Sequence, residues 1–129
     1  MTITRTISTS SHDDEQHIQV RDIQWNTEQH SIKAGRTIIK LTPTEYRLLL
    51  PLRSGTPVTY ANLAWVAYQY KVDDKVRLLM DKHIDRIRGK LRGTGIYVYC
   101  VMGYGYLLLP EHFPDETGSL LSAKYSSLL

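Results

Sequence analysis

The sequence is poor in cysteine and has no apolar leader. Cys100 is the single cysteine among 129 residues, so a disulfide within the chain is impossible. This excludes the small secreted domains that depend on several disulfides. The first residues are rich in threonine and serine and lack the apolar core of a secretory signal. Together these absences predict a cytoplasmic protein.

Long hydrophobic runs are also scarce. Residues 93–110 carry no formal charge and are long enough to be tested as a membrane span. This segment contains four glycines and four tyrosines, with a Gly-Tyr-Gly near its centre. Such a composition makes a poor helix, and an open pair of strands cannot cross lipid. The segment therefore predicts two strands and a turn, and no membrane association.

The composition fits one folded domain of ordinary size. Hydrophobic residues make up 42% of the chain and charged residues 22%, which allows a single modest core. We expect a flexible tail at residues 1–17, a domain at 18–110, and a tail or short docking helix at 111–129. The last segment has apolar side chains at helical spacing, namely Leu121, Tyr125, Leu128 and Leu129.

The first half of the domain predicts a small meander and then a helix. Short β-type runs occupy residues 18–20, 23–25, 31–33 and 37–41, with turns at 26–29 and 34–35. Thr42, Pro43 and Glu45 form a helix start with a capping box. Pro51 should kink or weaken this helix, and Gly55 should end it.

Two more helices and a hairpin are predicted in the second half. Thr59 caps a short helix at 60–67, whose inner face is expected to hold Leu63, Val66 and Ala67. A loop at 68–74 precedes the longest helix, at 75–91. That helix has one apolar stripe, formed by Val76, Met80, Ile84, Ile87 and Leu91. Strands at 96–102 and 104–109 then turn around Gly103.

Positive charge is concentrated on the longest helix. Residues 75–92 contain seven basic and two acidic side chains, a balance of 7 − 2 = +5 against +3 for the whole chain. A helix with an apolar face and a cationic face matches the major groove of B-DNA in width. The alternative is an ordinary solvated face with Arg77–Asp81 and Asp85–Arg88 ion pairs. The residues expected to point outward are Lys75, Leu78, Lys82, Asp85, Arg86 and Gly89, flanked by Arg77, Asp81, Arg88, Lys90 and Arg92.

The order of elements decides between these two interpretations. Three helices followed by a β-hairpin make a winged helix, and four motifs occur in sequence, namely LTPTEYRLL at 41–49, VTYANL at 58–63, HIDRIRGKL at 83–91 and GYGY at 103–106. In this combination the chain resembles the OmpR/PhoB-type C-terminal DNA-binding domain of response regulators, over residues 18–110.

The resemblance implies an α+β winged helix-turn-helix with a four-stranded N-terminal sheet, a three-helix core and a C-terminal wing. It also implies sequence-specific binding of double-stranded DNA by a bacterial transcriptional regulator, located in the cytoplasm and associated with the nucleoid. The third helix would enter the major groove, and the loop at 68–74 would meet RNA polymerase. The candidate DNA-binding residues are Lys75, Arg77, Lys82, His83, Asp85, Arg86, Arg88, Arg92, Tyr68 and Tyr104.

Several positions depart from the family pattern. Asp85 stands where a basic or polar residue is frequent, and it could accept a hydrogen bond from cytosine or repel phosphate. Positions where the family often has arginine, or threonine in one case, are occupied by Leu78, Tyr60, Cys100, Met102 and Leu107. Fewer phosphate contacts predict weaker binding or a different footprint on DNA, and a weak homodimer on DNA is a further possibility. No receiver domain is expected in a chain of this length.

The alternative function is a winged helix that contacts proteins and has lost its affinity for DNA. The tyrosines of the hairpin favour it, because aromatic residues are enriched at interface centres. These are Tyr97, Tyr99, Tyr104 and Tyr106. We expect neither an enzyme nor a cofactor, because no nucleophile or nucleotide-loop pattern is present. His12 and His17 flank an acidic cluster in the N-terminal tail, which we do not interpret as a metal site.

Overall fold

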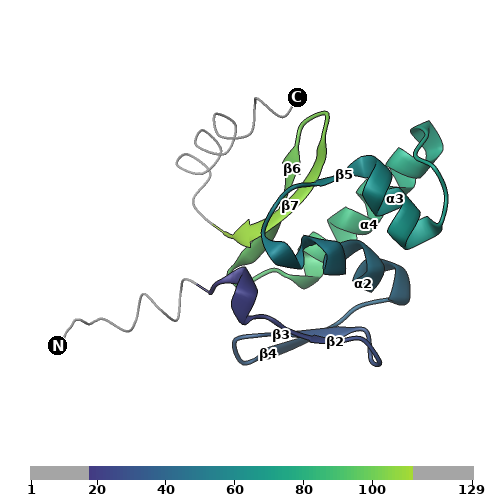
Figure 1. Cartoon of the computed structure of the whole chain (residues 1–129). Helices are drawn as coiled ribbons and strands as arrows, with labels where there is room; N and C mark the ends of the chain where they lie inside the picture. Colours follow the sequence, from purple (N-terminus) through teal and green to yellow (C-terminus); the bar gives the residue numbers. More distant parts are fainter. Residues whose placement is uncertain (1–17, 112–129) are drawn as a thin grey trace.

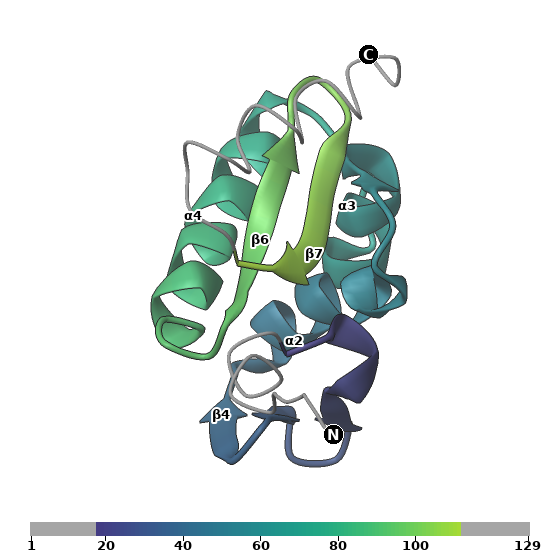
Figure 2. The same ribbon diagram turned by 90° about the vertical axis from the view of Figure 1, so that its left-hand side faces the viewer.

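The computed structural model describes residues 18–111. The chain forms an N-terminal sheet, three α-helices and a C-terminal hairpin, in that order (Figure 1). The N-terminal sheet lies at one end of the molecule and packs against α2 (Pro43–Leu49). The hairpin lies beyond α2, beside the other two helices (Figure 2). The expected tails at 1–17 and 112–129, including the apolar stripe from Leu121 to Leu129, lie outside the described residues.

The N-terminal sheet has three antiparallel strands, in the order β2-β3-β4. Their bounds are Gln24–Asn26, Ser31–Ala34 and Thr37–Lys40, close to the predicted runs. The prediction of a fourth strand at 18–20 is wrong, because Val20–Asp22 is a 3-10 turn, η1. Val20 and Ile23 are both buried, and the Ile23 amide donates to the Val20 carbonyl at 3.1 Å. A turn places both side chains in the core, whereas a strand at this spacing would point them to opposite faces.

The capping box at the start of α2 is confirmed. The Glu45 amide donates to Thr42 Oγ1 at 3.1 Å, and the Thr42 amide donates to Glu45 Oε1 at 2.9 Å. The expected effect of Pro51 is also confirmed, since the α-helix gives way to a 3-10 helix, η2 (Leu50–Ser54). Gly55 ends it with φ of 77°, a conformation that glycine adopts at little cost.

Helices α3 (Tyr60–Tyr68) and α4 (Asp74–Lys90) complete the three-helix core. Thr59 caps α3 as predicted, accepting from the Asn62 amide at 3.1 Å. Its predicted inner face is wrong at one position, because Val66 is 44% exposed and Ala64 is fully buried instead. Residues 63, 64 and 67 lie on one side of a helix at 100° per residue, and residue 66 does not.

The hairpin belongs to a three-stranded sheet in the order β5-β7-β6. Strands β6 (Ile96–Val101) and β7 (Gly105–Pro110) match the prediction, whereas β5 (Val58–Thr59) was not predicted. It is two residues long, too short to show alternation in a sequence. At Gly105 a Cβ would lie 1.8 Å from the Val58 carbonyl oxygen, so glycine permits this pairing.

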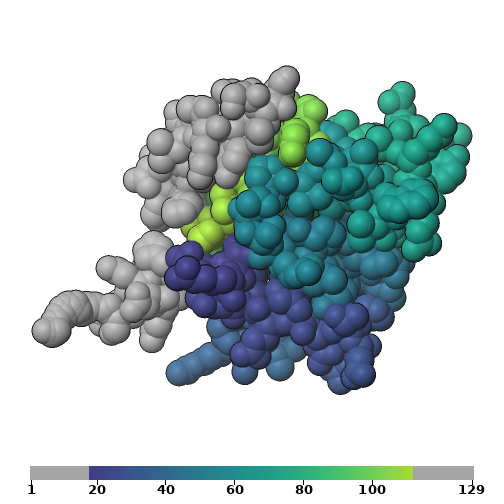
Figure 3. Space-filling model, in the orientation of Figure 1, coloured from purple at the N-terminus to yellow at the C-terminus, as the bar shows by residue number. Residues whose placement is uncertain are grey.

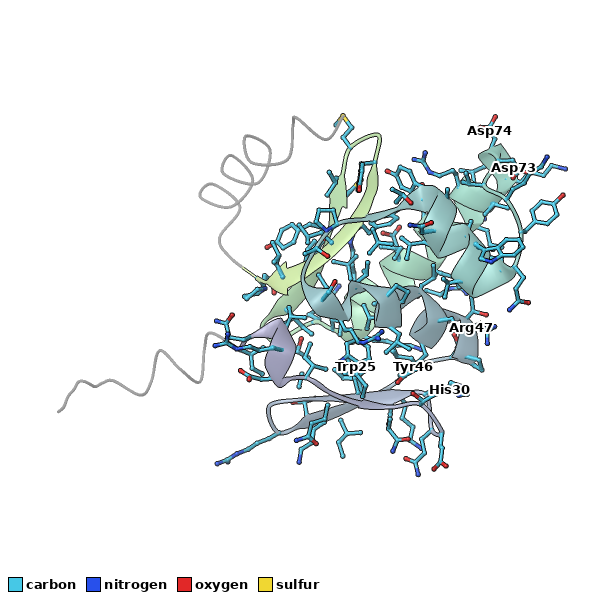
Figure 4. All side chains as sticks on the ribbon, in the orientation of Figure 1. Trp25, His30, Tyr46, Arg47, Asp73 and Asp74 are labelled. Atoms are coloured by element: carbon cyan, nitrogen blue, oxygen red, sulfur yellow. The ribbon has the colours of Figure 1, made fainter. Side chains whose placement is uncertain are left out.

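One continuous core joins the helices, the inner face of the hairpin and the N-terminal sheet. Tyr46 of α2 anchors that sheet, with its ring edge-on to Trp25 and His30 (Figure 4). Its hydroxyl hydrogen-bonds Thr27 Oγ1 at 3.0 Å. In the space-filling view the sheet forms the lower end of the molecule, well away from the α3–α4 connection (Figure 3).

Candidate nucleic-acid interface

Helix α4 divides into a buried stripe and an exposed face. Met80, Ile84 and Ile87 are fully buried, and Leu91 is 1% exposed, as the 3.6-residue period predicts. All six side chains or positions expected to point outward are exposed, namely Lys75, Leu78, Lys82, Asp85, Arg86 and Gly89. The exposed face is therefore real and extends for the length of the helix.

The amino end of α4 and the tip of the hairpin lie at the same end of the molecule (Figures 1 and 2). Asp73 caps the helix by accepting from the Val76 amide at 2.8 Å, and Asp74 stands in the first turn (Figure 4). These two acids stabilise the positive end of the helix dipole. They also make this end less attractive to phosphate than the following turns.

Four cations of the candidate site are exposed, namely Lys75, Lys82, Arg86 and Arg92. Within residues 18–111 none of them takes part in an ion pair. Their charge is therefore available to an anionic partner. Leu78 lies among them and is 64% exposed, so the same face also presents an apolar side chain.

Arg88 is held by the edge of the hairpin. Its Nε donates to the Val98 carbonyl at 2.9 Å, and its guanidinium lies 5.1 Å from the centre of the Tyr97 ring. A second nitrogen donates to Asp85 Oδ1 at 3.1 Å, the ion pair expected of a solvated face. Because β6 is an edge strand, this arginine satisfies a carbonyl that no neighbouring strand can pair.

Arg77 is also engaged inside the protein. Its guanidinium lies 3.6 Å from the centre of the Tyr60 ring, and its Nε is buried without a hydrogen-bond partner. Asp81 accepts a hydrogen bond from the Tyr106 hydroxyl instead of pairing with Arg77. Burial and this bond to Asp81 raise the pKa of Tyr106, and burial raises the pKa of Tyr60 to about 12. Both phenols are therefore neutral hydrogen-bond donors at ordinary pH.

His83 and Tyr68 form a pair beneath the exposed face. The Tyr68 hydroxyl lies 2.8 Å from His83 Nδ1, and both side chains are half-buried. Burial lowers the pKa of His83, and the nearby Arg86 charge lowers it further. Burial raises the pKa of Tyr68 to about 12. The pair is therefore neutral at pH 7 and links α3 to α4.

A contact that the sequence did not predict fixes the carboxyl end of α4. Lys90 Nζ donates to Glu45 Oε1 at 2.6 Å, across 45 positions of the chain. Glu45 is 1% exposed, so the capping residue of α2 also holds Lys90 of α4. The motif showed Glu45 as a cap, but only the fold brings the two helices together.

The architecture has counterparts among solved structures. The DNA-binding domain of CpxR from E. coli superposes with a TM-score of 0.58 and 22% identity, over 68% of this chain and 90% of that one. The DNA-binding domain of the response regulator AdeR was solved in complex with an intercistronic region. It superposes with a TM-score of 0.55 and 26% identity, over 70% of this chain and 95% of that one. This chain has the OmpR/PhoB-type winged-helix fold. No family model matches its sequence, and no curated protein does.

A third winged helix comes from a longer protein. It belongs to a family of redox sensors in the streptococci that evolved from two-component response regulators. The TM-score is 0.56 at 27% identity, over 70% of this chain but 40% of that one. The likeness therefore concerns the winged-helix domain and not the remainder of that protein.

The wing of this winged helix is poor in charge. Tyr104 is half-buried, and its carbonyl accepts from the Tyr60 amide at 2.9 Å. Met102 is 77% exposed and Cys100 is exposed, whereas Leu107 is fully buried. These three residues occupy positions that depart from the family pattern, and the described wing contains no arginine.

The described residues also bear on metal binding and on membrane crossing. No group of three His, Cys, Asp or Glu side chains within 18–111 is arranged to hold a metal ion. His12 and His17 lie outside that range. No helix in the described part of the chain has the length and apolar character that a membrane crossing requires.

Proposed function

We propose that this winged helix binds double-stranded DNA, with α4 in the major groove, and regulates transcription. The observation that carries the proposal is the exposed face of α4 and the turn after it, where four cations have no competing ion pair among the described residues. The structural likeness to AdeR, which was solved on DNA, supports the same use of the fold. The charge balance of the segment around α4 provides the attraction that phosphate binding needs.

Eight of the ten candidate residues fall into two groups in this proposal. Lys75, Lys82, Arg86 and Arg92 contact phosphates or bases directly. Arg77, Arg88, His83 and Tyr68 position α4 and the wing through their internal contacts. The other two are Asp85, on the outward face of α4, and Tyr104, half-buried in the turn between β6 and β7. Asp85 contributes to base selection, because a carboxylate accepts a hydrogen bond from cytosine.

The decisive experiment compares two single-charge deletions. Arg86→Ala should weaken binding to duplex DNA at low salt by about tenfold, since a good contact contributes ~1–3 kcal/mol. Lys40→Ala is the control, because Lys40 is also exposed but lies on β4 of the N-terminal sheet and not on α4. Fluorescence anisotropy measures both affinities, and thermal unfolding checks that both variants remain folded.

The salt dependence tests the same face independently. If three or four phosphates are neutralised, the logarithm of the affinity falls with the logarithm of salt with a slope of about −3 to −4. Arg86→Ala should reduce the magnitude of this slope by about 1 if it meets phosphate. Equal affinities of wild type, Arg86→Ala and Lys40→Ala for duplex DNA would show that α4 is not the recognition helix.

One finer proposal rests on the resemblance, and an alternative function rests on the tyrosines of the hairpin. The connection between α3 and α4 presents Tyr70, which is 54% exposed, as a contact for RNA polymerase. The second candidate function is a winged helix that binds proteins. It is favoured by Tyr97 and Tyr99 on the hairpin, whose rings pack edge-on with their centres 5.0 Å apart. Absence of binding to any duplex at low salt would select this second function.

A further inference from the structure

The hairpin sheet has two faces, and only one belongs to the core described above. Residues alternate along a strand, so Ile96 and Val98 of β6 and Tyr106 and Leu108 of β7 face the helices and belong to that core. The opposite face carries Tyr97, Tyr99 and Val101 from β6, and Leu107 and Leu109 from β7. We call these five side chains the outer wing face. Figure 2 shows the sheet from this side, with α3 and α4 behind it.

The outer wing face is apolar and contains no charged side chain. The register places Tyr99 beside Leu107 and Tyr97 beside Leu109, so the two tyrosines and two leucines form adjacent cross-strand pairs. The rings of Tyr97 and Tyr99 also contact one another edge-on. A water-facing side of a sheet normally carries polar residues, so this face is built to be covered.

Two side chains of this face are in fact shielded from water. Leu107 is fully buried and Val101 is 4% exposed, yet neither belongs to the core cluster that the helices share. Leu107 lies on β7, the central strand of this three-stranded sheet, where a side chain pointing away from the helices is shielded only by a further layer. Within residues 18–111 the helices all lie on the other side of this sheet (Figures 1 and 2).

We propose that the segment 119–129 of the same chain docks as an amphipathic helix on the outer wing face. The chain leaves the sheet at Pro110, the end of β7, so a short connection ties this segment to the sheet that carries the face it would cover. Leu121, Tyr125 and Leu128 recur with spacings of four and three residues, which places them on one side of a helix. Of the polar residues between them, Ser122 and Lys124 would flank this stripe and Ser126 would lie on the opposite side, facing water.

The dimensions agree with this arrangement. A helix over 119–129 is roughly 16 Å long, and a six-residue strand such as β7 spans about 20 Å, so the helix fits along the hairpin. The connecting residues 112–118 can reach roughly 23 Å when extended, enough to return along the sheet. The connection carries Pro114 and Gly118, residue types that favour a turn over a continuous helix or strand.

The docking explains two sequence features that the proposed function leaves unused. One is the replacement of charge by Leu107 on the wing, and the other is the apolar spacing in the last eleven positions of the sequence. It also occupies Tyr97 and Tyr99 within the molecule, which would remove them from the surface offered to another protein.

The direct test is nuclear Overhauser spectroscopy on the full chain. We expect contacts from the methyl groups of Leu107 and Val101 to the side chains of Leu121 and Tyr125. Mixing isotope-labelled with unlabelled protein separates contacts within one molecule from contacts between copies. Contacts that appear only between copies, or that depend on concentration, would assign the face to a second copy and overturn the proposal, as would their complete absence.

A pair of substitutions tests the energetic consequence. Tyr125→Asp should lower Tm by several degrees, because it places a charge against the apolar outer wing face. Ser126→Asp is the matched control, since it adds the same charge on the opposite side of the proposed helix and should leave Tm nearly unchanged. Equal effects of the two variants would contradict docking through this stripe. The measurement needs no DNA, so its outcome is independent of the proposed function.

Discussion

Glu45 shows how one side chain can serve a local and a tertiary purpose at once. It closes the capping box of α2 through the Thr42 amide and accepts from Lys90 of α4 at 2.6 Å. Burial alone would raise its pKa, but the hydrogen bonds from Lys90 and Thr42 outweigh burial and hold the pKa below 4.5. The charged form of Glu45 therefore stabilises the folded state.

Acid should remove this contribution. A carboxyl whose pKa is lower in the folded than in the unfolded state binds more protons when unfolded, so stability falls as the pH drops. The loss begins near the unfolded value of 4.5 and is complete once the pH is below the folded pKa. Glu45→Gln should flatten the dependence of unfolding free energy on pH between about pH 5 and 3.

Urea unfolding at a series of pH values measures this slope. Glu28→Gln is the control, because Glu28 is exposed in the turn between β2 and β3. The interpretation fails if both variants keep the wild-type slope. Glu45→Gln should also be less stable than wild type at pH 7, where the ion pair with Lys90 is lost.

At the scale of secondary-structure elements, two glycines predict opposite effects of the same substitution. Gly89 lies in α4, and apart from its chain neighbours and the nearby helix backbone no atom lies within 4 Å of the place that an alanine methyl group would occupy. At Gly105, by contrast, a Cβ would lie 1.8 Å from the Val58 carbonyl oxygen. Gly89→Ala should raise the unfolding free energy by about 0.5–1 kcal/mol, because alanine favours a helix. Gly105→Ala should lower it by more than about 2 kcal/mol, because β5 must separate from β7.

Denaturant unfolding of both variants checks this pair, with each serving as the other's control. A stable Gly105→Ala protein would mean that β5 does not pair with β7 as described. A destabilised Gly89→Ala protein would mean that the outward face of α4 is packed near its carboxyl end.

The same elements show what the sequence could reveal. Thr42, Thr59 and the stripe from Met80 to Leu91 were predictable, because capping and periodicity are local patterns. The turn at Val20–Asp22 was predicted as a strand, since its conformation depends on placing Val20 and Ile23 in a core formed by distant residues. Strand β5 was missed because two residues carry no period.

For the candidate interface, the sequence predicted which side chains point outward but not which of them are already held by contacts inside the protein. The outward positions of Lys82, Asp85 and Arg86 follow from counting residues along a helix. The engagement of Arg88 with the Val98 carbonyl and of Arg77 with the Tyr60 ring does not, because both contacts join α4 to elements distant in the chain. Helical position alone cannot distinguish a free arginine from one that secures a neighbouring strand.

At the scale of the whole molecule, the limited charge of the interface predicts cooperative binding. The four free cations lie on α4 or just beyond it, and the described wing carries no arginine to anchor a neighbouring groove. We therefore expect a single winged helix to bind one half-site weakly. High occupancy of the DNA site then requires a second copy bound beside the first. Two copies held on one duplex raise each other's effective concentration without any new base contact.

We therefore expect this protein to bind paired half-sites more tightly, per site, than one half-site. The comparison uses duplexes with one half-site, or with two half-sites spaced by about 10–10.5 bp, so that both copies lie on the same side of the DNA. A spacing of roughly 15 bp is the control, because half a helical turn places the second copy on the opposite side. The expected result is a Hill slope above one with the first spacing alone. Equal affinity per site on all three duplexes would show independent binding, which would leave DNA recognition by α4 intact but exclude contact between neighbouring copies.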